Sequence, residues 1–191
     1  TVAFLILRVM RGGIGAMFLK TGASICFIGT AFSALAFNNK NMEYGILVIM
    51  GLIFGLLGDV WLDMKYVYKQ HNHIYTYAGI ICFIANHVFY IPAVAFKYGE
   101  GQFEWWYAVI NILASVIFAT VTLALEKPMK VKYGRYKKIL FLYGVFLSCT
   151  MFTAIFGMFY KGFSKDFFML SIASVLFTLS DLVLSNIYFK E

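Results

Sequence analysis

Two aspartates lie within stretches so apolar that they must cross a membrane. Asp59 follows the sequence Gly-Leu-Leu-Gly, and Asp181 follows Thr-Leu-Ser. A charged aspartate near the centre of a membrane helix opposes insertion by about 2.5–3.5 kcal/mol, so such residues usually mark functional sites. Carboxyl groups serve proton transfer and the stabilisation of a developing cation. We therefore take Asp59 and Asp181 as candidate catalytic residues, although a structural salt bridge, or a cap on a broken helix near Gly58, is the alternative for Asp59.

A histidine and a tyrosine share one face of another apolar segment. His87 and Tyr90 are three residues apart, and both can form hydrogen bonds. A histidine inside a membrane needs a polar partner, which predicts a network of aspartate, His87 and Tyr90. At about 1.5 Å per helical residue, Asp59, Asp181 and His87 lie near the middle or in the same half of the membrane. They could therefore line one cavity, although an ordinary buried histidine is the alternative for His87.

Other polar residues flank these candidates. Asp63 shares a helix face with Asp59, and its alternative role is an interfacial partner of Lys65 or Lys69. Lys20 begins its apolar segment, where it could hold a lipid phosphate or simply extend to the membrane surface.

A polar stripe accompanies Asp181 and its neighbour Ser180. Ser174, Thr178, Asp181 and Ser185 follow one another at helical spacing. Small hydroxyl residues often serve only helix packing in membranes, but a carboxylate among them favours a hydrated cavity.

A metal site is not expected. His71 and His73 could join His87 and an aspartate around zinc, but the pair lies in a predicted loop far from His87, and no His-Glu-x-x-His sequence occurs. Solvated loop histidines explain the pair better, and we expect no metal or other cofactor.

The elements that position these residues are membrane helices. The chain of 191 residues is 62% hydrophobic and only 13% charged, which excludes a soluble domain. We predict an all-α, polytopic transmembrane bundle of about seven helices, forming a single integral membrane domain over residues 1–191. The apolar segments are a partial one at Val2–Met10 and six full ones at Leu19–Phe37, Tyr44–Asp63, Tyr75–Phe96, Trp105–Leu125, Ile139–Tyr160 and Phe167–Phe189.

Membrane topology explains the net charge of +7 better than binding to nucleic acid does. If every segment spans, twelve of the sixteen lysines and arginines lie on one face. By the positive-inside rule that face is cytoplasmic, and the loop 126–138 should lie against anionic lipid headgroups. We expect an integral, multi-pass protein with no nucleic-acid partner, in the plasma membrane if the chain is bacterial, with its site opening toward the cytoplasmic leaflet.

The motifs, taken together, resemble the YhhN family of membrane proteins, which includes lysoplasmalogenases. The likeness runs from Lys20 along essentially the whole chain, although the family usually has a proline where Thr21 stands here. It implies eight helices in the full family fold, the last one following the Ser-Asp motif. The matching residues are Gly58 and Asp59, then Gly79, Phe83, His87 and Tyr90, and finally Ser180 and Asp181.

The resemblance implies hydrolysis of the vinyl-ether bond of a lysoplasmalogen. This lysophospholipid would be cleaved to a fatty aldehyde and a glycerophospho-headgroup. Because removal from water favours the neutral form of a carboxyl group, we assign the deeper Asp181 as the protonated general acid. Asp59 then stabilises the cation and activates water, although the two roles could be exchanged, and His87 and Tyr90 orient both. We assign substrate binding to Lys20, Ser180 and Asp63.

Other functions remain open at this stage. A Ser180–Asp181–His87 arrangement would suit a lysolipid ester or amide hydrolase, but adjacent helix residues point about 100° apart and the chain has no Gly-x-Ser-x-Gly elbow. A zinc amidohydrolase of the alkaline ceramidase kind would need a histidine pair in its last helix, which this chain lacks. A proton-coupled transporter also uses intramembrane aspartate and histidine, but we find no inverted repeat. Oligomeric partners are left open.

Overall fold

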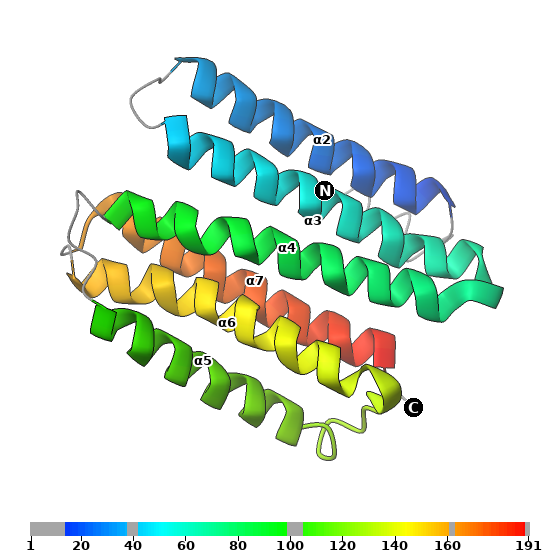
Figure 1. Cartoon of the computed structure of the whole chain (residues 1–191). Coiled ribbons are helices and arrows are strands. Elements are labelled where there is room, and N and C mark those ends of the chain that lie inside the picture. The colour runs from blue at the N-terminus through cyan, green and yellow to red at the C-terminus, as the bar shows by residue number, and fades with distance from the viewer. Residues whose placement is uncertain (1–13, 38–41, 99–104, 161–162, 190–191) are drawn as a thin grey trace. The chain divides into compact units, whose positions relative to one another are not determined.

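The computed structural model describes residues 14–37, 42–98, 105–160 and 163–189, and most of these residues lie in helices (Figure 1). The prediction of an all-helical membrane protein is confirmed. The predicted number of about seven helices is one too many for the described residues, and the partial segment at 2–10 lies outside them. The long helices are α2 (Ile14–Phe37), α3 (Met42–Val67), α4 (Asn72–Tyr98), α5 (Trp105–Ala124), α6 (Lys137–Tyr160) and α7 (Lys165–Phe189).

Each of these six helices is long and apolar enough to cross a membrane. A span needs about 20 predominantly apolar residues, because no water in the bilayer core can satisfy an unpaired backbone group. Large apolar side chains such as Phe27, Ile117 and Val183 are more than half exposed on the helix surfaces. In a membrane these surfaces face lipid, and the chain is an integral, multi-pass protein.

The chain divides into two compact units, residues 1–93 and 94–191, which we describe separately. Helix α4 passes from the first unit into the second between Ala93 and Val94. In the first unit, α2 and α3 run side by side in opposite directions (Figure 1). In the second unit, α6 contacts both α5 and α7.

Glycines bring α3 and α4 close together in the first unit. Gly51, Gly55 and Gly58 lie on the face of α3 that meets α4. A Cβ atom on Gly58 would stand 2.9 Å from the ring of Phe83 and 3.2 Å from the carbonyl oxygen of Gly79. Small residues at such a crossing let two membrane helices approach closely, so the glycine beside Asp59 fixes where α4 passes it.

Polar groups hold α5 against α6 in the second unit. The side-chain amide of Asn111 donates to the Thr153 hydroxyl at 2.6 Å, and the Ser148 hydroxyl lies 3.2 Å from the Ser115 carbonyl oxygen. Both serines are fully buried. Hydrogen bonds therefore hold neighbouring membrane helices together in this unit, whereas in the first unit glycines allow two helices to approach closely.

Candidate active site

An ion pair joins α2 to α3 inside the membrane region. The ammonium of Lys20 lies 2.6 Å from Oδ1 of Asp59, and the two side chains are 19% and 22% exposed. Intramembrane charges are stable when they are paired in this way. Lys20 stands more than a turn inside α2 rather than at the head of the helix, so its expected position was wrong. Its predicted contact with a lipid phosphate stays a prediction.

His87 and Tyr90 form the second part of the candidate site, on α4. His87 is 1% exposed, and its ring lies edge-on to the Tyr90 ring with the centroids 6.3 Å apart. Tyr90 packs on α3 at Gly51, where the absent Cβ leaves room for the phenol ring. The shared helix face expected from the spacing of these two residues is present.

Asp59 and His87 lie at different levels of the α3–α4 pair. The amide of Asn86 faces Gly55, which sets the antiparallel register of the two helices. Asp59 is four residues beyond Gly55, and His87 is one residue beyond Asn86 in the other direction. Five residues of helical rise correspond to about 7 Å. The two residues are therefore separated by about 7 Å along the helix axes.

Asn86 is a buried polar residue that the sequence analysis did not single out. Its side chain is 4% exposed, and Oδ1 has no hydrogen-bond partner within the described ranges. A buried amide oxygen that lacks a partner is costly, and each such atom calls for an explanation. Asn86 is therefore a further polar residue on the part of α4 that meets α3. The signal in the sequence was an asparagine directly before an intramembrane histidine.

Asp181 is held within the second unit by a tyrosine. The Tyr143 hydroxyl on α6 donates a hydrogen bond to Oδ2 of Asp181 on α7. Both side chains are half-buried. The sequence analysis missed Tyr143, although it lies about 9 Å from the start of α6 and Asp181 about 12 Å from the end of α7. Because these helix ends meet at one side of the unit, the similar depths were the available signal.

The hydroxyl groups of α7 bond within their own helix. Ser174, Thr178 and Ser185 each donate to a backbone carbonyl of α7, at 2.9 Å in all three cases. Such bonds satisfy a hydroxyl without any partner helix. Ser180 is exposed, so it does not share the environment of Asp181. The stripe is therefore mainly a satisfied helix face from which Asp181 reaches α6.

The remaining candidates lie at the end of α3 and the start of α4. Asp63 is half-buried and forms no ion pair with the side chains that the structure describes. His71 and His73 are exposed at the turn between the two helices. Within the described ranges, no three residues of the types histidine, cysteine, aspartate and glutamate are grouped so as to hold a metal ion.

The chemical difference between the aspartates is in their partners. Asp59 is paired with the ammonium of Lys20, which carries a charge. Asp181 accepts a hydrogen bond from the Tyr143 hydroxyl, which is neutral.

The comparisons agree with the resemblance noted from the motifs. A family model described as the YhhN family matches residues 15–190, nearly the whole chain. No curated protein and no solved structure matches.

Proposed function

Because the chain belongs to the YhhN family, we propose that it is a lysoplasmalogenase-like hydrolase. Its substrate would be a lysophospholipid with a vinyl-ether chain, and its products a fatty aldehyde and a glycerophospho-headgroup. The observation that carries this proposal is the unequal pairing of the two intramembrane aspartates, Asp59 with the Lys20 ammonium and Asp181 with the Tyr143 hydroxyl.

Vinyl-ether hydrolysis needs an acid and a negative charge. A proton adds to the carbon of the double bond that is remote from oxygen, which leaves an oxocarbenium ion. Water then adds to the cation and loses a proton, and the hemiacetal collapses to an aldehyde and an alcohol. Glycosidases meet the same demand, a cation next to oxygen, with one protonated and one ionised carboxyl group.

In this proposal each aspartate has one role. Asp181, the deeper of the two, gives the proton, because removal from water favours the neutral form of a carboxyl group. Asp59 is the carboxylate that stabilises the cation and activates water. Lys20 positions Asp59, while His87, Tyr90 and the Asn86 amide oxygen orient the reacting groups along α4.

The charge distribution and the family membership support a proposal for the orientation and location of the protein. We propose that the site opens toward the cytoplasmic leaflet, in the plasma membrane if the chain is bacterial. The bilayer and the lysolipid are the partners, and no nucleic acid is involved. An ester hydrolase built on Ser180 is disfavoured, because that hydroxyl is exposed and on another face of α7 than Asp181.

Product analysis with purified protein tests the proposal. We expect fatty aldehyde from a lysoplasmalogen and no fatty acid from the matching ester lysolipid. A positioned general acid contributes about 10²–10⁴-fold, so Asp181→Asn and Asp59→Asn should each lower turnover by at least ~10². Asp166→Asn, an exposed acidic residue at the opposite end of α7, is the control and should keep the parent rate.

Two results would reject the proposal. Fatty acid as the product would point to ester hydrolysis. Aldehyde release at the parent rate from both the Asp59 and Asp181 variants would exclude the carboxylate mechanism.

A further inference from the structure

The segment between α5 and α6 is folded and anchored on the end of α7. We call residues 125–138 the basic loop, and they include the first two residues of α6. Val131 and Tyr133 point inward and are 3% and 5% exposed. The Lys132 backbone N–H donates to the carbonyl oxygen of Phe189 at 2.9 Å, and the ring of Tyr133 lies edge-on to that of Phe189. The last turn of α7 and the basic loop therefore form one structure.

A single carboxylate closes the basic loop. Glu126 accepts a hydrogen bond from the Lys137 ammonium at 2.6 Å and another from the Tyr133 backbone N–H at 3.1 Å. The bond from Lys137, followed by the bond from Tyr133, lowers the pKa of Glu126 below its ordinary value. These two hydrogen bonds give the basic loop a defined conformation. A run of charged residues that only contacts solvent would not need one.

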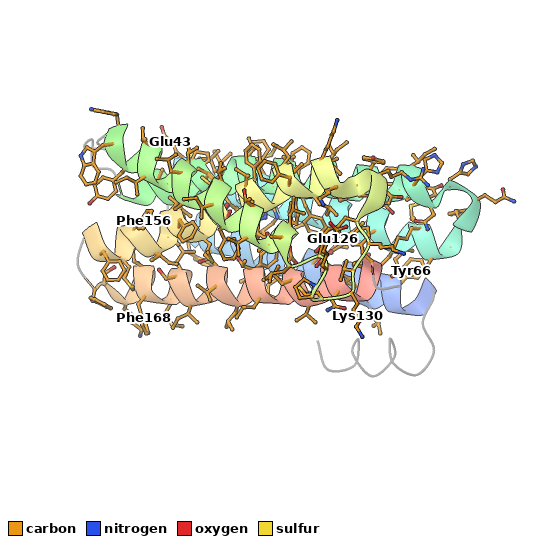
Figure 2. The ribbon with its side chains drawn as sticks, turned by 90° about the horizontal axis from the view of Figure 1, so that it is seen from below. Glu43, Tyr66, Glu126, Lys130, Phe156 and Phe168 are labelled. Carbon is orange, nitrogen blue, oxygen red and sulfur yellow. The ribbon has the colours of Figure 1, made fainter. Side chains whose placement is uncertain are left out.

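The outer side of the basic loop is strongly cationic. Glu126 is the single acidic residue within residues 125–138, and it is already engaged by Lys137. Figure 2 shows Lys130 pointing away from the helices, at the end of the second unit opposite to Phe168. The exposed basic residues are Lys127, Lys130, Lys132, Arg135, Lys137 and Lys138.

The backbone at Lys130 is unusual for a lysine. Its φ of 52° lies in the left-handed region, which residues other than glycine, asparagine and aspartate rarely adopt. This conformation helps the chain to turn Val131 inward while Lys130 and Lys132 stay exposed. A lysine where glycine would fit better indicates that its charge is useful there.

We propose that the basic loop is a binding surface for the headgroups of anionic phospholipids. The loop directly joins two membrane-spanning helices, so it lies at headgroup level. A lipid surface fits this position better than a nucleic acid or an acidic protein. Each basic residue near an anionic membrane surface contributes about 1 kcal/mol, or roughly fivefold in affinity. Bound lipid would also stabilise the end of α7, two turns from Asp181.

Lipid selectivity of the full-length protein tests this proposal without reference to enzymatic activity. The purified chain in neutral detergent is titrated with short-chain phosphatidylglycerol or phosphatidylcholine, and bound lipid is counted by native mass spectrometry. We expect a preference for phosphatidylglycerol that falls about fivefold in Lys130→Gly and further when Lys127→Gln and Lys138→Gln are added. Lys165→Gln, at the other end of α7, should keep the parent preference.

The Lys130→Gly variant separates binding from folding. Glycine suits the left-handed backbone at this position, so the melting temperature without lipid should stay the same or rise. A parent protein that binds both lipids equally would overturn the proposal, as would an unchanged preference in the triple variant. Displacement of phosphatidylglycerol by equimolar inorganic phosphate would also overturn it, since the surface would then select a free anion.

Discussion

The two units of the chain each hold one aspartate among membrane helices, but they do so by different means. In residues 1–93, Asp59 meets an ammonium, and glycines pack the neighbouring helices. In residues 94–191, Asp181 meets a phenol, and buried hydroxyl and amide groups pack the helices. The first unit compensates a charge, whereas the second satisfies hydrogen bonds.

In the proposed mechanism this difference in partners corresponds to a difference in role. An ammonium brings a compensating charge to a carboxylate, whereas a phenol brings a hydrogen bond and no charge. A pair of carboxyl groups in unequal surroundings is the usual arrangement for acid and base on one enzyme.

The ion pair should be the most sensitive feature of the first unit. Lys20→Met removes the ammonium that pairs with Asp59 and should destabilise the protein by about 3 kcal/mol, the lower limit for buried pairs, because both side chains are partly exposed. Lys20→Met combined with Asp59→Asn should regain most of this stability, but not the activity. Thermal melting in detergent measures both, and a single variant as stable as the parent would contradict a charge-compensating role.

Helix packing should respond to added volume in one unit and tolerate it in the other. Gly58→Ala places a Cβ 3.2 Å from the Gly79 carbonyl oxygen, a backbone atom that cannot easily move, and should cost about 2 kcal/mol. Gly144→Ala meets Ala119 at an ordinary 3.4 Å. Since alanine favours helix by up to ~1 kcal/mol, this control should be neutral or stabilising. Equal melting temperatures for the two variants would show that the glycines do not determine the approach of α4.

The phenol in the second unit should matter less for stability than for rate. Tyr143→Phe removes one neutral hydrogen bond, which costs about 1 kcal/mol. Aldehyde release should fall while the KM stays close to the parent value, because in the proposed mechanism Tyr143 positions Asp181 and does not hold the headgroup. A raised KM with an unchanged kcat would instead assign Tyr143 to substrate binding.

The helix positions could be predicted from the sequence, and the polar contacts could not. The six full apolar segments coincide with the six helices. In the bilayer each backbone N–H and C=O group needs a hydrogen-bond partner within the protein, and an apolar segment meets this need by forming a helix. The start of α2 was set too late, at Leu19 rather than Ile14, because Lys20 was taken as a boundary. Its charge is compensated inside the helix by Asp59, which lies on another helix. The chain has 13 tyrosines and 21 phenylalanines. Tyr143 was missed because its own sequence position does not distinguish it from these other aromatic residues.

The smallest expected effect concerns the Glu126 carboxylate. The hydrogen bond from Lys137 lowers the pKa of Glu126 in the folded chain below its ordinary 4.5. Its contribution to stability is therefore fully present above pH 4.5 and is lost as the pH falls through the lowered folded value. Glu126→Gln should melt slightly below the parent at neutral pH and equal it in acid. A difference that persists at low pH would show that the loop does not depend on this charge.

The protonation states of the two aspartates test the central claim most directly. Infrared spectroscopy of the purified protein at neutral pH detects the C=O stretch of a protonated carboxyl group, which a carboxylate lacks. We expect one such band, absent from Asp181→Asn and retained in Asp59→Asn. A band that disappears with Asp59 and persists without Asp181 would reverse the two roles and contradict the account.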